Sequence, residues 1–150
     1  MEYGFSFRYP GEGEFSEAQG HIHIRLPMLP GTDFDTRDLS IHFRTDDIFS
    51  RRLINRLPVI DQSRYVKSRY MEILGLTFLR EIEQDAGMSR AHELLSYSTA
   101  RNSQVVTIWF HLATTSPDVY GLGPGRIVEI DGEAAKEIVL YVVSSFTWLD

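Results

Sequence analysis

Imidazole and guanidinium side chains recur at alternate positions in two short segments of this chain. The first segment carries His21, His23 and Arg25, and the second carries His42 and Arg44. Isoleucine, leucine and phenylalanine occupy the positions between them. Because successive side chains of a strand point to opposite faces, we expect two strands that each have one apolar face and one basic face.

Such a basic face can support three kinds of chemistry. Three imidazoles can hold a metal ion, histidines beside arginines can act as acid and base on a phosphate ester, and the same groups can bind an anion. No catalytic motif accompanies the histidines, so His21, His23 and His42 are catalytic candidates without assigned roles, and we predict neither a metal site nor a cofactor. The predicted anion site consists of His23, Arg25, His42 and Arg44. The residue types alone favour the alternative of a solvated strand face without a ligand.

Antiparallel pairing of the two segments would place these groups together on one sheet face. A hairpin that closes near Thr32 predicts three facing pairs, which are His23 with His42, Arg25 with Ser40, and His21 with Arg44. The prediction also requires that helices cover the isoleucine face and leave the polar face uncovered.

Hydrophobic patterns predict strands toward both ends of the chain and helices in the middle. Aromatic residues alternate over residues 3–9, and Thr45-Asp46-Asp47 is typical of the start of a helix, which Pro58 would stop. Further helices are expected over about 62–86 and 89–97, and strands over 105–112, 126–131 and 138–146. The predicted fold is an α+β domain with a mostly antiparallel sheet of about six strands, ordered βββ-αα(α)-βββ, with helices packed on one face.

Length and composition indicate one globular domain over residues 1–150. The chain is 43% hydrophobic and 24% charged, which is ordinary for a folded domain. It contains no cysteine, which excludes disulfides, thiolate catalysis and cysteine-ligated metals, and it shows neither a signal-peptide pattern nor a membrane-spanning apolar run. We therefore expect a cytoplasmic protein that does not engage a membrane.

Charge argues against general binding of nucleic acid, because the formal net charge is −6. The middle of the chain is nevertheless locally basic, and phosphate contacts could come from Arg51, Arg52, Arg56, Arg64, Lys67 and Arg69 on the predicted helices. The glycines at 121, 123 and 125 followed by Arg126 could cradle a phosphate, but they are predicted to join two strands, which favours a plain connection.

Large aromatic residues suggest a partner interface. Trp109, His111, Tyr141 and Trp148 are the predicted interface residues, since aromatic side chains are favoured in interface centres. The leading hypothesis is a non-enzymatic protein-binding or regulatory module that acts through a sheet face and can self-associate. Two alternatives stay open, namely a small enzyme or sensor for a phosphorylated or nucleotide ligand at the basic face, and a nucleic-acid binder that uses arginine-rich helices.

Overall fold

The computed structural model describes residues 4–9, 11, 13–25, 34–58, 66–87, 90–115 and 132–150. Two helices and nine strands are defined within these ranges. In chain order they are β1 (Phe5–Ser6), β2 (Glu14–Ala18), β3 (His21–Arg25), β4 (Phe34–Thr45), α1 (Asp47–Ile54), β5 (Val66–Ile73), β6 (Leu76–Gly87), β7 (Arg90–Arg101), β8 (Gln104–Thr115), α2 (Gly132–Ser144) and β9 (Thr147–Trp148).

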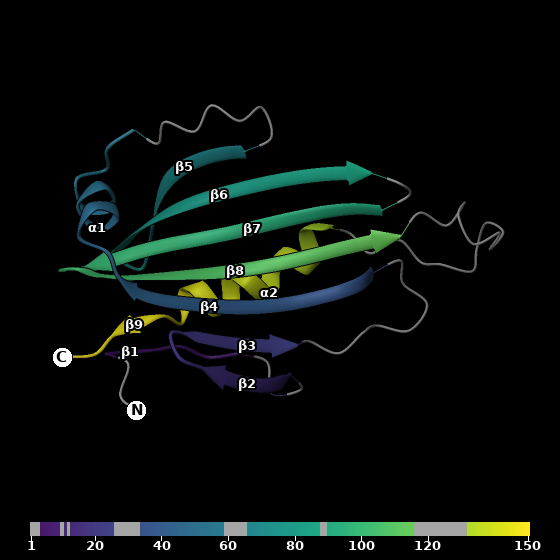
Figure 1. The fold of residues 1–150 in the computed structure, drawn as a ribbon, viewed down its shortest axis with the longest axis horizontal. Helices are drawn as coiled ribbons and strands as arrows, with labels where there is room; N and C mark the ends of the chain where they lie inside the picture. The colour runs from purple at the N-terminus through teal and green to yellow at the C-terminus, as the bar shows by residue number, and fades with distance from the viewer. Residues whose placement is uncertain are drawn as a thin grey trace, which may run out of the picture.

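Seven of these strands form one antiparallel sheet with the order β2-β3-β4-β8-β7-β6-β5 (Figure 1). The strands β1 and β9 pair antiparallel in a separate two-stranded sheet, which brings the two ends of the chain together. The predicted α+β class with a mostly antiparallel sheet is confirmed. The order of elements differs from the predicted one, since four strands precede α1 and four lie between α1 and α2.

Helix α2 covers one face of the seven-stranded sheet and lies behind it in Figure 1. Its residues Val139, Val142 and Val143 are buried in the main hydrophobic cluster together with strand residues such as Ile24 and Phe110. The strand residues of this cluster alternate along β3, β4 and β8, as a sheet with one packed face requires. This packed face is the isoleucine face expected from the sequence.

Helix α1 packs on the opposite face of the sheet, at one end, so the prediction that the helices pack on one face was wrong. Leu53 is buried against Leu79 of β6 and Val105 of β8, and Phe49 and Tyr70 pack around them. Asp46 caps the helix, because its Oδ1 accepts a hydrogen bond of 2.8 Å from the backbone amide of Phe49. The predicted short helix after Thr45 is therefore present, with Asp46 rather than Thr45 as its N-cap.

The helices predicted over 62–86 and 89–97 were wrong. Residues 66–73, 76–87 and 90–101 are the strands β5, β6 and β7. Near the α1 end both sheet faces are covered, so Phe78 and its neighbour Leu79 are both buried and the expected alternation is lost. The turn Leu74-Gly75, in which both residues have positive φ, joins β5 to β6 where a continuous helix was expected.

The strand predicted over 138–146 was also wrong, because residues 132–144 form α2. The run is rich in β-branched residues, but its buried positions Val139, Val142, Val143 and Phe146 follow helical spacing. Packing against the sheet therefore outweighs the β-propensity of the valines. The strand predicted over 126–131 and the glycines at 121, 123 and 125 lie outside the described residues.

Candidate functional site on the open sheet face

The face of the seven-stranded sheet opposite α2, called the open face below, gathers all five histidines of the chain. The histidines come from four neighbouring strands, with His21 and His23 on β3, His42 on β4, His92 on β7 and His111 on β8. Within the part of the chain that the structure describes, α1 is the helix that packs on this face, and it does so at one end. The predicted sharing of one face by His21, His23 and His42 is thus observed.

The register between β3 and β4 differs from the predicted one. His21 lies opposite His42, His23 opposite Ser40, and Arg25 opposite Asp38. The observed register is displaced by two residues from the predicted one. An even displacement leaves every side chain on its predicted face, so the faces are correct although the facing pairs are not.

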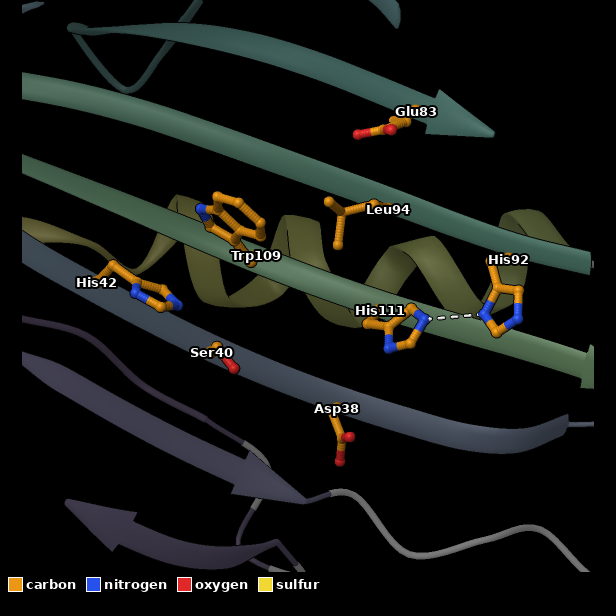
Figure 2. Close-up of a pocket in the computed structure, with 8 residues that line it drawn as sticks. All are labelled: Asp38, Ser40, His42, Glu83, His92, Leu94, Trp109 and His111. Carbon is orange, nitrogen blue, oxygen red and sulfur yellow. Dashed lines mark hydrogen bonds between the residues drawn. The ribbon is translucent and has the colours of Figure 1, made fainter. Parts of the chain in front are cut away.

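A cavity of about 350 Å³ lies on the open face (Figure 2). Its walls come from strands β4, β6, β7 and β8, through Asp38, Ser40, His42, Glu83, His92, Leu94, Trp109 and His111. Trp109 lies between His42 on one side and His92 with His111 on the other in Figure 2. It is 37% exposed, although β8 is a central strand. A tryptophan that is this exposed on a central strand presents a large apolar surface to a ligand or a partner.

Two histidines stack at one side of the cavity. The ring centroids of His21 and His42 are 4.3 Å apart and the ring planes differ by 18°, while His42 also lies 5.4 Å from Trp109. Burial lowers the pKa of His42, and the neighbouring His21 and Arg44 lower it further. His42 is therefore biased toward its neutral form at neutral pH.

A second histidine pair lies at the other side of the cavity. His92 Nδ1 and His111 Nε2 are 3.2 Å apart, which is hydrogen-bonding distance for one N–H that donates to the other ring (Figure 2). The sequence-based prediction missed His92, because the segment was assigned to a helix. The alternation of His92, Leu94 and Ser96 on β7 is the signal that could have identified it.

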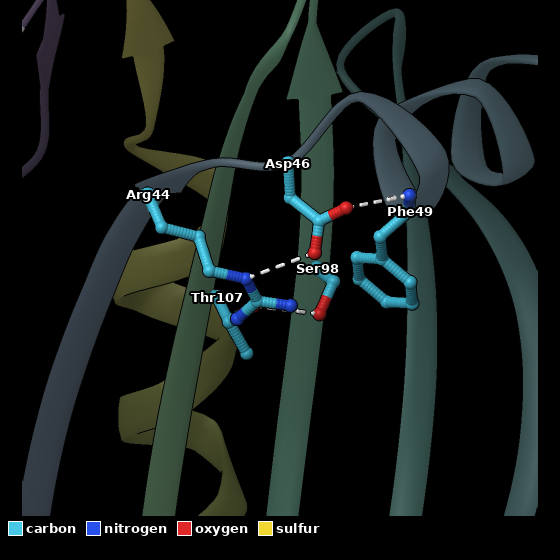
Figure 3. Close-up of polar contacts among 5 residues, drawn as sticks. All are labelled: Arg44, Asp46, Phe49, Ser98 and Thr107. Atoms are coloured by element: carbon cyan, nitrogen blue, oxygen red, sulfur yellow. Dashed lines mark hydrogen bonds and ion pairs between the residues drawn. The ribbon is translucent and has the colours of Figure 1, made fainter.

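Both arginines of the predicted anion site lie beside carboxylates. Arg25 Nε is 3.7 Å from Asp38 Oδ1, and His23 Nε2 is 3.4 Å from the same oxygen. Arg44 Nε lies 3.3 Å from Asp46 Oδ2, and its guanidinium sits over the ring of Phe49 (Figure 3). The structure therefore places His23, Arg25, His42 and Arg44 on or beside one face, but their positive charge is largely offset by neighbouring carboxylates.

The four predicted interface residues do not form one surface. Trp109 and His111 line the cavity on the open face. Tyr141 is 51% exposed on α2, which covers the other face, and Trp148 packs edge-on against Phe5 and Phe146. Trp148 therefore docks on the body of the domain through β9.

The basic residues proposed to bind nucleic acid do not lie together on helices as predicted. Arg51 and Arg52 lie on α1, whereas Lys67 and Arg69 lie on the edge strand β5. Arg56 donates hydrogen bonds to Glu72 and Thr77 across the end of β5 and β6. The predicted arginine-rich helix pair is thus replaced by one short helix and a strand, and Arg64 lies outside the described residues.

Within the described residues, no three or more histidine, aspartate and glutamate side chains are grouped so that they could hold one metal ion. No helix of the described chain is both long enough and apolar enough to cross a membrane.

Comparison with known proteins identifies a fold but no family. No family model matches the chain, and no characterised protein matches it in sequence. Among solved structures, a crystal structure from Bacteroides thetaiotaomicron VPI-5482 matches with a TM-score of 0.64 and 10% sequence identity. The match covers 98% of this chain and 46% of that chain, so this chain spans about half the length of its structural neighbour. At this identity the likeness concerns the fold alone.

Proposed function

We propose that this protein is a non-enzymatic binding module that takes a protein partner on its open sheet face. The observation that carries the proposal is Trp109, which is 37% exposed in the middle of a central strand and lines the cavity. An aromatic anchor surrounded by polar groups is the usual anatomy of an interface centre.

The surroundings of Trp109 support this proposal. Leu94 adds apolar surface beside it, and Ser40, His42 and His111 offer hydrogen-bonding groups around it. Ser98 and Thr107, one row further toward α1, are buried and hydrogen-bonded to each other at 2.9 Å. The sheet beneath the anchor is therefore well ordered, and a partner would meet a rigid surface rather than one that must first be organised.

Phosphate-ester chemistry at this face receives less support than binding does. Arginines promote such reactions when they face the developing charge of the substrate. Arg25 and Arg44 instead lie beside Asp38 and Asp46, so little positive charge remains to attract a phosphorylated ligand. We therefore infer that the histidines serve recognition rather than acid–base catalysis.

A second candidate function is the binding of a small molecule in the same cavity. Its volume of about 350 Å³ lies at the lower end of the range that ligand sites occupy. Such a ligand would stack an apolar part against Trp109 and use His42 or His111 for hydrogen bonds. In Trp148→Phe, Trp109 is the remaining tryptophan of the chain, so its fluorescence would report binding directly.

The proposed partner site is tested by crosslinking in the organism of origin. A photoreactive amino acid placed at Ser40, which lies opposite Trp109 on the open face, should capture a defined protein. The same group at Tyr141, on the exposed side of α2, should not. Capture from Tyr141 alone would contradict the proposal. Capture of a second copy of this chain from the open face, with dimers in sedimentation, would identify self-association as the function of this face.

A further inference from the structure

We propose that His92 and His111 form a two-histidine site for a divalent late first-row transition metal, such as Zn²⁺, Ni²⁺ or Cu²⁺. The remaining coordination positions would be taken by water or by a donor atom of a bound partner. This inference goes beyond the proposed partner binding and does not depend on it.

The distance between the two ring nitrogens carries the proposal. His92 Nδ1 and His111 Nε2 are 3.2 Å apart. Two imidazole nitrogens bound to one tetrahedral zinc ion, each at about 2.0–2.1 Å, are separated by roughly 3.3 Å. In the hydrogen-bonded rotamers, the two side chains therefore already bring one nitrogen of each ring to about the spacing that chelation of one ion requires.

The orientation of the rings sets what must change when the ion binds. The ring centroids are 5.4 Å apart and the planes differ by 17°, so the two nitrogens face each other across a shared hydrogen bond. When the ion binds, the ring that donates this hydrogen bond must carry its proton on its other nitrogen. Rotation of both rings about their Cβ–Cγ bonds would then turn the two lone pairs to one side, where an ion can meet both. This torsion is soft in histidine, so the rotation needs no movement of the strands.

The strands that carry the pair fix its spacing. His92 lies opposite Ala113, and His111 lies opposite Leu94, so the histidines occupy diagonal positions on β7 and β8. Both strands are internal to the sheet, with β6 and β4 on their outer sides. Metal affinity benefits from such a pair, because little conformational freedom is lost when the ion binds.

The charge around the pair favours a cation. Asp38 lies opposite His111 on β4, and both Asp38 and Glu83 line the cavity that His92 and His111 share. Negative groups around a cavity raise the local concentration of cations and lower that of anions. Asp38 also contacts His23 and Arg25, and Arg25 offsets its charge, so we assign the electrostatic role to Glu83.

The other histidine pair lacks this geometry and provides the control. His21 and His42 stack face to face, with centroids 4.3 Å apart and planes within 18°. The ring planes of the two pairs are inclined to a similar degree, but the rings of His21 and His42 overlap more closely, and His21 Nε2 is buried without a hydrogen-bond partner. The direct contact between ring nitrogens that His92 and His111 make is the feature that distinguishes the proposed site.

The test is a calorimetric titration of the full chain, purified without a histidine tag, with ZnCl₂ and with NiCl₂. We expect saturable binding of one ion per chain. His92→Gln and His111→Gln should each weaken it at least tenfold, whereas His21→Gln should stay within twofold of the unchanged protein. The titration contains no partner protein, so failure of the metal site and failure of the proposed function are read from separate measurements.

Nitrogen NMR of the imidazole rings in the unchanged protein gives a second readout that does not depend on the folding of any variant. Zn²⁺ should shift His92 Nδ1 and His111 Nε2 most. The proposal is overturned if no ion binds, if both glutamine variants bind as well as the unchanged protein, or if the largest shifts occur at His21 and His42.

Discussion

The five histidines on the open face differ because of their surroundings, although they share one residue type and one sheet face. His42 is partly buried and stacked on His21, and its pKa is lowered by burial, by His21 and by Arg44. His92 and His111 share a hydrogen bond at the far side of the cavity. Four of the five histidines therefore form two pairs with different chemistry, and His23 lies beside Asp38 instead.

The lowered pKa of His42 predicts how stability depends on pH. In the unfolded chain a histidine takes up its proton near pH 6.5, whereas folded His42 does so at lower pH. Between these two pKa values the unfolded state binds more protons, so the free energy of unfolding falls as the pH falls through this window. Wild-type protein should therefore lose stability between pH 7 and pH 5.

His42→Gln tests this contribution, because glutamine keeps a polar side chain without a titrating group. Urea unfolding at several pH values should show a smaller loss of stability between pH 7 and pH 5 in the variant than in the wild type. At pH 8, where the histidine is neutral in both states, the difference between the two proteins gives the effect of the substitution itself. Equal pH slopes for the two proteins would contradict the role given to His42.

At the scale of elements, the turn of the β5–β6 hairpin contains a strained residue. Its turn consists of Leu74 and Gly75, both with positive φ, and Leu74 is 83% exposed. A left-handed conformation costs a leucine roughly 1 kcal/mol, whereas asparagine adopts it readily and Asn-Gly is a preferred sequence for such turns. Because the Leu74 side chain is so exposed, its packing does little to offset this cost.

Leu74→Asn should therefore stabilise the protein, by roughly 1 kcal/mol if the strain is fully relieved. Thermal and urea unfolding would measure the gain. Leu74→Ala removes the exposed apolar surface but keeps the strained conformation, so it should change stability much less. A destabilised Leu74→Asn variant would show that the turn is not the one described.

The packing of α2 gives a second prediction for an element. Phe146 follows the helix and contacts Phe5, Phe78 and Trp148, with ring centroids 5.5, 6.2 and 5.2 Å away. Truncation of a buried phenylalanine typically costs about 3–5 kcal/mol. Phe146→Ala should lower the free energy of unfolding by this amount. It should also remove the near-ultraviolet circular dichroism signal that arises from the packed ring of Trp148.

The matched control for Phe146 is Leu140, which is 43% exposed on the same helix. Leu140→Ala should stay within about 0.5 kcal/mol of the wild type, because exposed positions away from special features tolerate change. Similar losses for the two variants would contradict the orientation of α2 on the sheet.

Some features of the strands could be predicted from the sequence, and others could not. Alternation in residues 21–25 and 39–44 correctly predicted both strands and their faces, because one face is packed and the other is polar. It could not predict the register, since a displacement of two residues preserves every face. Around Phe78 and Leu79 both faces are buried, so the periodicity that marks a strand is absent and a helix was predicted.

The candidate site was predicted in part for the same reasons. His21, His23 and His42 were correctly assigned to one face from strand alternation, and Trp109, predicted as an interface residue, lines the cavity, while its role in an interface stays a prediction. His92 was missed because its strand was taken for a helix, and its proximity to His111 depends on strand neighbours that are far apart in sequence. The pairing of the arginines with Asp38 and Asp46 likewise follows from tertiary structure rather than from local pattern.

At the scale of the whole molecule, the two faces of the seven-stranded sheet are covered to different extents. One face of the seven-stranded sheet is packed by α2, and the two-stranded sheet of β1 and β9 adds Phe5 and Trp148 to the same hydrophobic cluster. The other face carries α1 at one end and the cavity with its histidines and Trp109 beyond it. The residues of the proposed binding site therefore lie outside the main hydrophobic cluster.

The most direct test of this account is the affinity of the captured partner for Trp109→Ala compared with Tyr141→Ala. Both residues are exposed aromatics, and they lie on opposite sides of the molecule. We predict that Trp109→Ala weakens binding at least tenfold, which is about 1.4 kcal/mol, while Tyr141→Ala stays within twofold and both variants unfold like the wild type. Unchanged affinity in Trp109→Ala, or a loss confined to Tyr141→Ala, would contradict the claim that the open face is the binding site.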